Sequence, residues 1–116
     1  MCDCRMTHMK LYLPTNMEGH ELAVEHVQQR LADRFKGFTV MEGEGGWKAG
    51  SEIVTEPVTV IESYGDVAHE NAVIFMDRIA EYVAGVNLYD ENAIMFTVDH
   101  SQYLVQTDDG SLRGVA

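Results

Sequence analysis

Long apolar runs are missing from this 116-residue sequence, and cysteine, lysine and tryptophan are scarce. No apolar run approaches the roughly 18 residues that a membrane helix needs, so we expect no membrane-spanning segment. The first residues, from Met1 to His8, lack the apolar stretch of a secretory signal. The expected location is therefore the cytoplasm, unless a signal was removed before this sequence begins. The length fits a single domain with one core.

Both cysteines, Cys2 and Cys4, lie in the first four residues. A disulfide between them would close too small a loop to stabilise a fold. Together with His8 they offer three soft metal ligands, but a structural zinc site needs a fourth ligand at a defined spacing. We therefore predict no metal and no other cofactor. We interpret residues 1–8 as a flexible tail. This interpretation includes the case in which the natural start is Met9 and the residues before it are additions.

Basic residues are few. Eight Lys and Arg oppose nineteen Asp and Glu, which gives a net charge of −11. Nucleic-acid binding draws most of its affinity from cationic side chains, so we expect no direct binding to DNA or RNA, and an anionic membrane would repel the chain. The acidity fits a high-salt cytoplasm, an ordinary acidic domain, or the recruitment of a basic partner protein.

The sequence also lacks the common catalytic motifs. It contains neither a G-x-S-x-G nucleophile turn nor a phosphate-binding GxxxxGK[ST] loop. No two histidines stand four residues apart on a helix, since His20 and His26 are six apart. The missing nucleophile turn and the lack of a core cysteine set aside serine hydrolases and thiol enzymes. The missing phosphate-binding loop leaves little support for a phosphate site, and the chain leans away from catalysis.

The residues that are present predict alternating strands and helices. Strands are expected at 9–13, 38–41, 52–61 and 93–98, with residues 101–105 either prolonging the last strand or forming a short extra one. Apolar residues at three- and four-residue spacing predict a helix over 20–35, ended by Gly37, and a second helix that ends near Gly85. We assign the domain to residues 9–105 and interpret residues 106–116 as a flexible tail.

This β-α-β-β-α-β order predicts an α+β, ferredoxin-like fold: a four-stranded antiparallel sheet with two helices on one face. The chain itself leaves the other face uncovered. Two expected strands nevertheless carry apolar residues at both odd and even positions, which is typical of strands buried on both faces. We therefore expect a homo-oligomer that forms through the open sheet face. The residues concerned are Ile53, Val54, Val58, Val60 and Ile61 in one strand and Ile94, Met95, Phe96 and Val98 in the other.

A glycine-rich hairpin carries the only tryptophan, Trp47. Four glycines within eight residues predict a wide, irregular tip. Trp47 is either an aromatic contact for a ligand or a side chain that folds back to close the core, and we favour closure. Glu44 and Glu56, with two further glutamates nearby, have three possible roles: they hold a cation, they serve as general acid and base, or they form a solvated tip, which we favour.

The stretch from Tyr12 to Ile61 resembles a domain-of-unknown-function family of small bacterial proteins, number 3574. The family pattern has a helix ending in phenylalanine, a Gly-hydrophobic-Thr-Val strand, a Gly-x-Trp turn and a Glu-Pro strand. The matching residues are Phe35, Gly37, Phe38, Thr39, Val40, Gly45, Trp47, Ile53, Glu56 and Val60. The resemblance implies a fold and no activity. The chain departs from the family in lacking a lipoprotein signal and in its acidity, as a viral or haloarchaeal relative would.

The sequence therefore favours a non-enzymatic binding or interaction module that acts as a homo-oligomer. The alternatives are an oligomeric sensor or sequestering protein for a nucleotide or metabolite, a small dimeric ferredoxin-like enzyme, and an acidic mimic of nucleic acid that inhibits DNA-binding machinery. The candidate binding residues are Trp47, Glu44, Glu56, Tyr64 and His100. If the chain is an enzyme, Tyr64 and His100 are the residues whose substitution should abolish turnover.

Overall fold

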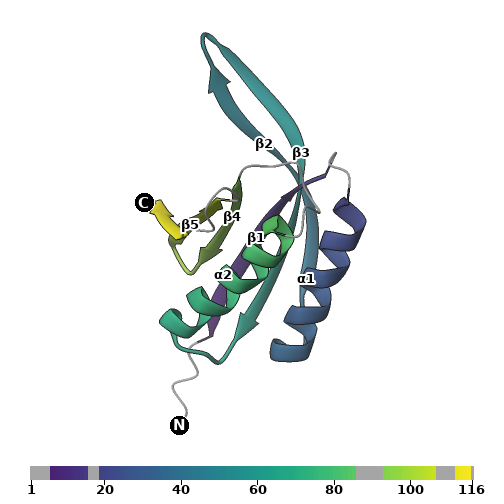
Figure 1. Cartoon of the computed structure of the whole chain (residues 1–116), viewed down its shortest axis with the longest axis vertical. Helices are drawn as coiled ribbons and strands as arrows, with labels where there is room; N and C mark the ends of the chain where they lie inside the picture. Colours follow the sequence, from purple (N-terminus) through teal and green to yellow (C-terminus); the bar gives the residue numbers. More distant parts are fainter. Residues whose placement is uncertain (1–5, 16–18, 86–92, 107–111, 116) are drawn as a thin grey trace.

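The computed structural model describes residues 6–15, 19–85, 93–106 and 112–115. These residues form two helices and six strands (Figure 1). In chain order the elements are β1 (Thr7–Pro14), α1 (His20–Phe35), β2 (Thr39–Ala49), β3 (Glu52–Gly65), α2 (His69–Gly85), β4 (Ala93–Val98), β5 (Ser101–Gln106) and β6 (Leu112–Val115). Cys2 and Cys4 lie outside the described residues. Neither described helix is long and apolar enough to cross a membrane.

The six strands form one sheet in the order β2-β3-β1-β4-β5-β6, and every neighbouring pair is antiparallel. Both helices cover the same face of this sheet (Figure 1). The α+β class and the helix layer are as predicted, but the sheet has six strands rather than four. Residues 101–106 form a separate strand because a turn at Asp99 and His100 returns the chain alongside β4. Residues 112–115, within the stretch expected to be a tail, pair with β5.

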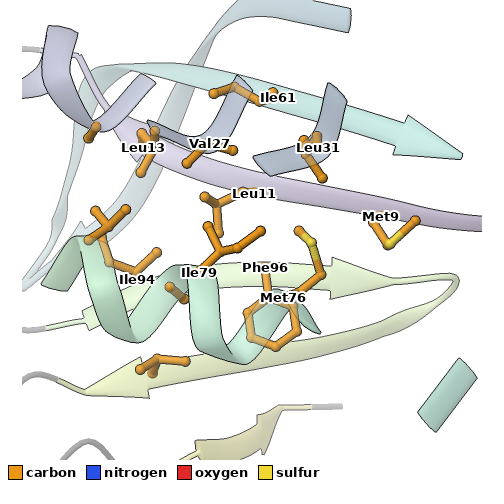
Figure 2. Close-up of a cluster of buried hydrophobic side chains, with 14 of the residues drawn as sticks. Met9, Leu11, Leu13, Val27, Leu31, Ile61, Met76, Ile79, Ile94 and Phe96 are labelled. Carbon is orange, nitrogen blue, oxygen red and sulfur yellow. The ribbon is translucent and has the colours of Figure 1, made fainter. Parts of the chain in front are cut away.

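The core lies between the helices and one face of the sheet (Figure 2). Alternate residues of β1, namely Met9, Leu11 and Leu13, are fully buried and point toward the helices. The predicted helical stripes supply the opposite side of the core. From α1 the buried residues are Ala23, Val27 and Leu31, and from α2 they are Ala72, Met76, Ile79, Ala80, Val83 and Ala84.

The end of α1 differs from the prediction in one detail. The left-handed residue that ends the helix is Lys36, with φ of 71°, and Gly37 follows it. The Lys36 N–H donates to the Ala32 carbonyl oxygen at 2.8 Å, which satisfies one of the last helical acceptors. Phe35, just before this cap, packs against the end of β3, where a Cβ on Gly65 would overlap the Phe35 ring. Gly65 is therefore a close-approach glycine.

The β2–β3 hairpin is regular, which corrects the prediction of a wide, irregular tip. The two strands pair without interruption from Thr39–Glu62 to Ala49–Glu52, so three of the four glycines lie within a strand. Only Gly50, in the two-residue turn, has a positive φ, 65°. A positive φ at the first turn residue is typical of a type II′ hairpin turn, which suits glycine. The other three glycines, Gly43, Gly45 and Gly46, lie in the extended backbone of β2 and have no positive φ.

The end of the hairpin stands free of the other strands. Strand β1 ends at Pro14, opposite Val58, and one further backbone bond joins the Thr15 N–H to the Pro57 carbonyl oxygen. Beyond that bond, residues 44–49 and 52–57 form strand pairs only with each other among the described elements, and they project from the body as an arm (Figure 1). Pro57 marks the point where β3 becomes an edge strand on its β1 side, in agreement with its inability to donate a ladder hydrogen bond. We call this two-stranded segment the arm.

A partly buried acid in α2 gives a testable pH dependence. Burial, followed by the charge of Glu81 one turn later and a hydrogen bond with it, raises the pKa of Asp77 to about 6. Because this pKa exceeds its unfolded value, the native state holds the proton more tightly, and stability falls as pH rises from about 4 through 6. We expect Asp77→Asn to raise the free energy of unfolding at pH 7.5 by about 1 kcal/mol, the size of a common single-substitution effect.

Urea unfolding at pH 7.5 and at pH 4.0 checks this prediction. The gain should shrink toward zero at pH 4.0, where the wild-type carboxyl is largely protonated in the folded protein. An equal gain at both values of pH would show that ionisation of Asp77 is not the cause.

Candidate functional site

The face of the sheet opposite the helices is uncovered by any described element, and it carries an unbroken line of apolar side chains. Five adjacent strands each contribute one apolar residue to this line. Each of these residues lies directly opposite the next one on the neighbouring strand. We call this line the apolar row. Its members, from β2 to β5, are Met41, Val60, Tyr12, Met95 and Leu104. Each is partly exposed, whereas their neighbours in sequence at Leu11, Ile61 and Phe96 are fully buried.

A groove of about 340 Å³ lies where the arm meets the apolar row. Its lining includes Tyr12, Met95 and Leu104 of the row, together with Trp47, Glu44 and Glu56. Three of the five predicted site residues therefore share one groove. The hairpin register brings them together, since Glu56 is the direct partner of Gly45, between the other two.

Trp47 does not close the core, contrary to our favoured interpretation. Its side chain is 49% exposed. The arm carries it beyond the end of β1, where, among the described strands, only β3 pairs with β2. The structure thus leaves Trp47 as an aromatic surface on the groove, next to two carboxylates.

Tyr64, the fourth predicted residue, lies at the other end of the open face and is 51% exposed. Its ring stacks on the imidazole of His8, with centroids 4.3 Å apart and planes 5° from parallel. His8 Nε2 lies 2.7 Å from a carboxylate oxygen of Glu62. Sequence reasoning missed this His–Glu pair, because the two residues are 54 positions apart and only the β1–β3 register brings them together.

His100, the fifth predicted residue, lines a separate cavity of about 710 Å³ at the start of α2. Asp99 organises this region. One of its oxygens accepts the backbone N–H of His8 at 3.1 Å and the other lies 3.0 Å from His69 Nδ1. The hydrogen bond with His69, and then that from His8, hold the pKa of Asp99 below its usual value. His100 and Tyr64 therefore belong to neither the groove nor a common site.

The described residues hold no group of three or more His, Cys, Asp and Glu side chains placed to bind a metal ion. What the groove offers is an aromatic side chain from each of two segments, apolar side chains from the row, and two carboxylates. Such a lining suits a flat, partly apolar ligand or a covering protein surface.

Comparison with solved structures finds proteins of similar fold, whereas the two comparisons by sequence find no match. No protein-family model and no curated protein sequence matches this chain. A phage SAM lyase solved in complex with S-methyl-5′-thioadenosine aligns with a TM-score of 0.56 and 6% sequence identity, over 96% of this chain and 89% of that chain. A Bacillus cereus protein related to NIF3 aligns with a TM-score of 0.52 and 13% identity, over 93% of this chain and 28% of that one. The chain thus spans little more than a quarter of the second protein.

Proposed function

We propose that this chain is a homo-oligomeric binding module whose subunits associate through the open sheet face. The observation that carries the proposal is the apolar row, which crosses five strands on a face that no described element covers. A continuous exposed apolar patch on a small protein typically marks an interaction surface.

The topology supports a second copy as the cover. The order β2-β3-β1-β4 within the sheet is the ferredoxin-like order, in which both helices lie on one face and the other face has no cover from the same chain. The arm adds to this argument, because an isolated two-stranded ribbon is only marginally stable in water. It exposes Trp47, at 49%, on the same face of the hairpin as Met41 of the apolar row, so a surface that covers this face would also bury the Trp47 ring. The open sheet face of a second copy offers the apolar row as such a covering surface.

Sedimentation velocity of the purified chain tests the proposal. We expect a mass of two or more subunits at low micromolar concentration. The run should be made in 0.15 M and 1 M salt, because a net charge of −11 per chain opposes self-association and salt screens it. A monomer at 100 µM in both buffers would refute association through this face.

A second candidate function is the binding of a nucleoside-like small molecule in the groove. It is favoured by the aromatic and carboxylate lining around Trp47 and Tyr12. It is also favoured by analogy with the phage SAM lyase, whose structure holds S-methyl-5′-thioadenosine and aligns with nearly the whole chain. This analogy rests on fold alone.

Thermal unfolding with and without millimolar S-methyl-5′-thioadenosine tests the second candidate. Ligand at 100 times its Kd should stabilise the chain by about 2.7 kcal/mol. Trp47→Ala should abolish the shift, whereas Ile53→Ala should preserve it, because Ile53 lies on the same arm but does not line the groove. No shift in the wild type, or an equal shift in Trp47→Ala, would exclude this groove as the binding site.

A further inference from the structure

Strand β2 presents a long unpaired edge. It is the outermost strand on its side of the sheet, and along its 11 residues only β3 pairs with it among the described elements. Every residue of β2 except Gly45 is exposed. One complete side of its backbone is therefore open to another chain.

The hydrogen bonds show which backbone groups point outward. The Pro57 carbonyl oxygen accepts the N–H of Thr15 at 3.1 Å, so this residue directs its backbone groups away from β2. Its partner Glu44 therefore belongs to a non-hydrogen-bonded pair, and directs its own N–H and C=O away from β3. Because the pattern alternates along an antiparallel ladder, Glu42 and Gly46 also point their backbone groups outward.

This edge lacks most of the features that normally prevent strand addition. Edge strands are usually interrupted by proline, a bulge or inward charges, or covered by another element. Strand β2 contains no proline and its register has no bulge, and Lys48, near the turn, is its one lysine. The centre of the strand contains three glycines, which have no side chains, so a partner backbone can approach closely there. These residues are Gly43, Gly45 and Gly46.

The charge around the edge distinguishes between partners. The hairpin carries Glu42, Glu44, Glu52 and Glu56 against the single cation Lys48. A second copy paired along this edge would bring the same carboxylates together, in a chain of net charge −11. An extended segment rich in lysine or arginine would meet opposite charge instead.

We infer that the outer edge of β2 binds an extended basic segment of a partner protein as an added strand. Main-chain hydrogen bonds to the outward groups of β2 supply the affinity in this mode, and the carboxylates select the charge of the partner. The edge is separate from the open sheet face, so a subunit can pair with this partner while its open face contacts another copy.

Fluorescence anisotropy with labelled ten-residue peptides tests the inference. The probe alternates lysine and valine, and its two controls are the same peptide methylated on alternate backbone nitrogens and a peptide that alternates glutamate and valine. We expect the first to bind and both controls to bind at least ten-fold more weakly. Gly46→Pro, which removes an outward N–H, should weaken binding at least ten-fold, whereas Gly46→Ala should not, since its Cβ meets neighbouring atoms at an ordinary 3.5 Å.

Amide hydrogen exchange locates the contact. The lysine–valine peptide should slow exchange at Glu42, Glu44 and Gly46, whereas the amides of Gly43 and Gly45 already bond β3 and should change little. Binding that 0.5 M salt abolishes and Gly46→Pro leaves intact would show charge attraction alone, and would overturn the inference. So would an absence of binding, or slow exchange at the three outward amides without peptide, which would mean that a second copy covers the edge.

Discussion

Replacing Val60 with aspartate is expected to dissociate the oligomer. Val60 lies in the apolar row, directly opposite Met41 on one side and Tyr12 on the other. If a second copy covers this face, the new carboxylate is buried without a partner in the oligomer, at a cost of at least about 3 kcal/mol per site. The dissociation constant should then rise by roughly 100-fold or more. Sedimentation equilibrium over a concentration series measures the change.

A matched variant on the helix layer separates this effect from added negative charge. Ile74 is also apolar and is 50% exposed, but it lies on α2, on the opposite side of the sheet. Ile74→Asp adds the same charge and should leave the mass unchanged. Circular dichroism should show that both variants are folded, because neither residue is fully buried in the single chain. Equal dissociation by both variants would place the interface elsewhere.

The order of elements was predictable because helical periodicity is a local property of the sequence. The spacing of Val27 and Leu31 in one helix, and of Met76, Ile79 and Val83 in the other, identifies the buried stripes that the structure shows. The sheet was predicted less completely. The polar, glycine-bearing sequence after residue 106 gave no strand signal, yet its last residues pair with β5. Edge strands of this kind depend on a neighbouring backbone more than on their own side chains.

The candidate groove was predictable only in part. The hairpin register gathers Trp47, Glu44 and Glu56 from positions close in sequence, and these were predicted. The contacts His8–Glu62 and His69–Asp99 join residues 54 and 30 positions apart. No spacing rule connects them, because strand order and register determine which distant residues become neighbours. Glycine composition also misled, since it predicted an irregular loop where the backbone is extended.

Strand β4 shows most clearly what the sequence left open. Met95 and Phe96 are both apolar, and the alternating pleat requires that they face opposite sides of the sheet. The sequence does not say which of the two faces the helices. In the structure Phe96 is fully buried, between Leu11 and Tyr103 of the adjacent strands, and its ring stacks on that of Tyr103 with centroids 5.2 Å apart. Met95 belongs to the apolar row on the open face.

These two adjacent residues should therefore give opposite results. Phe96→Ala leaves a cavity beneath α2 and should lower the free energy of unfolding by about 3–5 kcal/mol, a large part of the stability of a small domain. Met95→Ala should lower the stability of the isolated subunit by much less, because its side chain is only partly buried. Its main effect should be on association, because it removes apolar area from the proposed interface.

Urea unfolding at a concentration below the dissociation constant, together with sedimentation, separates the two properties. Phe96→Ala should lower the urea midpoint of unfolding. Met95→Ala should instead lower the average mass measured by sedimentation, because it weakens association. If Met95→Ala destabilises the isolated subunit as much as Phe96→Ala does, then both faces of β4 are covered within one chain. The open sheet face would then not exist in solution, and the proposal of association through it would fail with it.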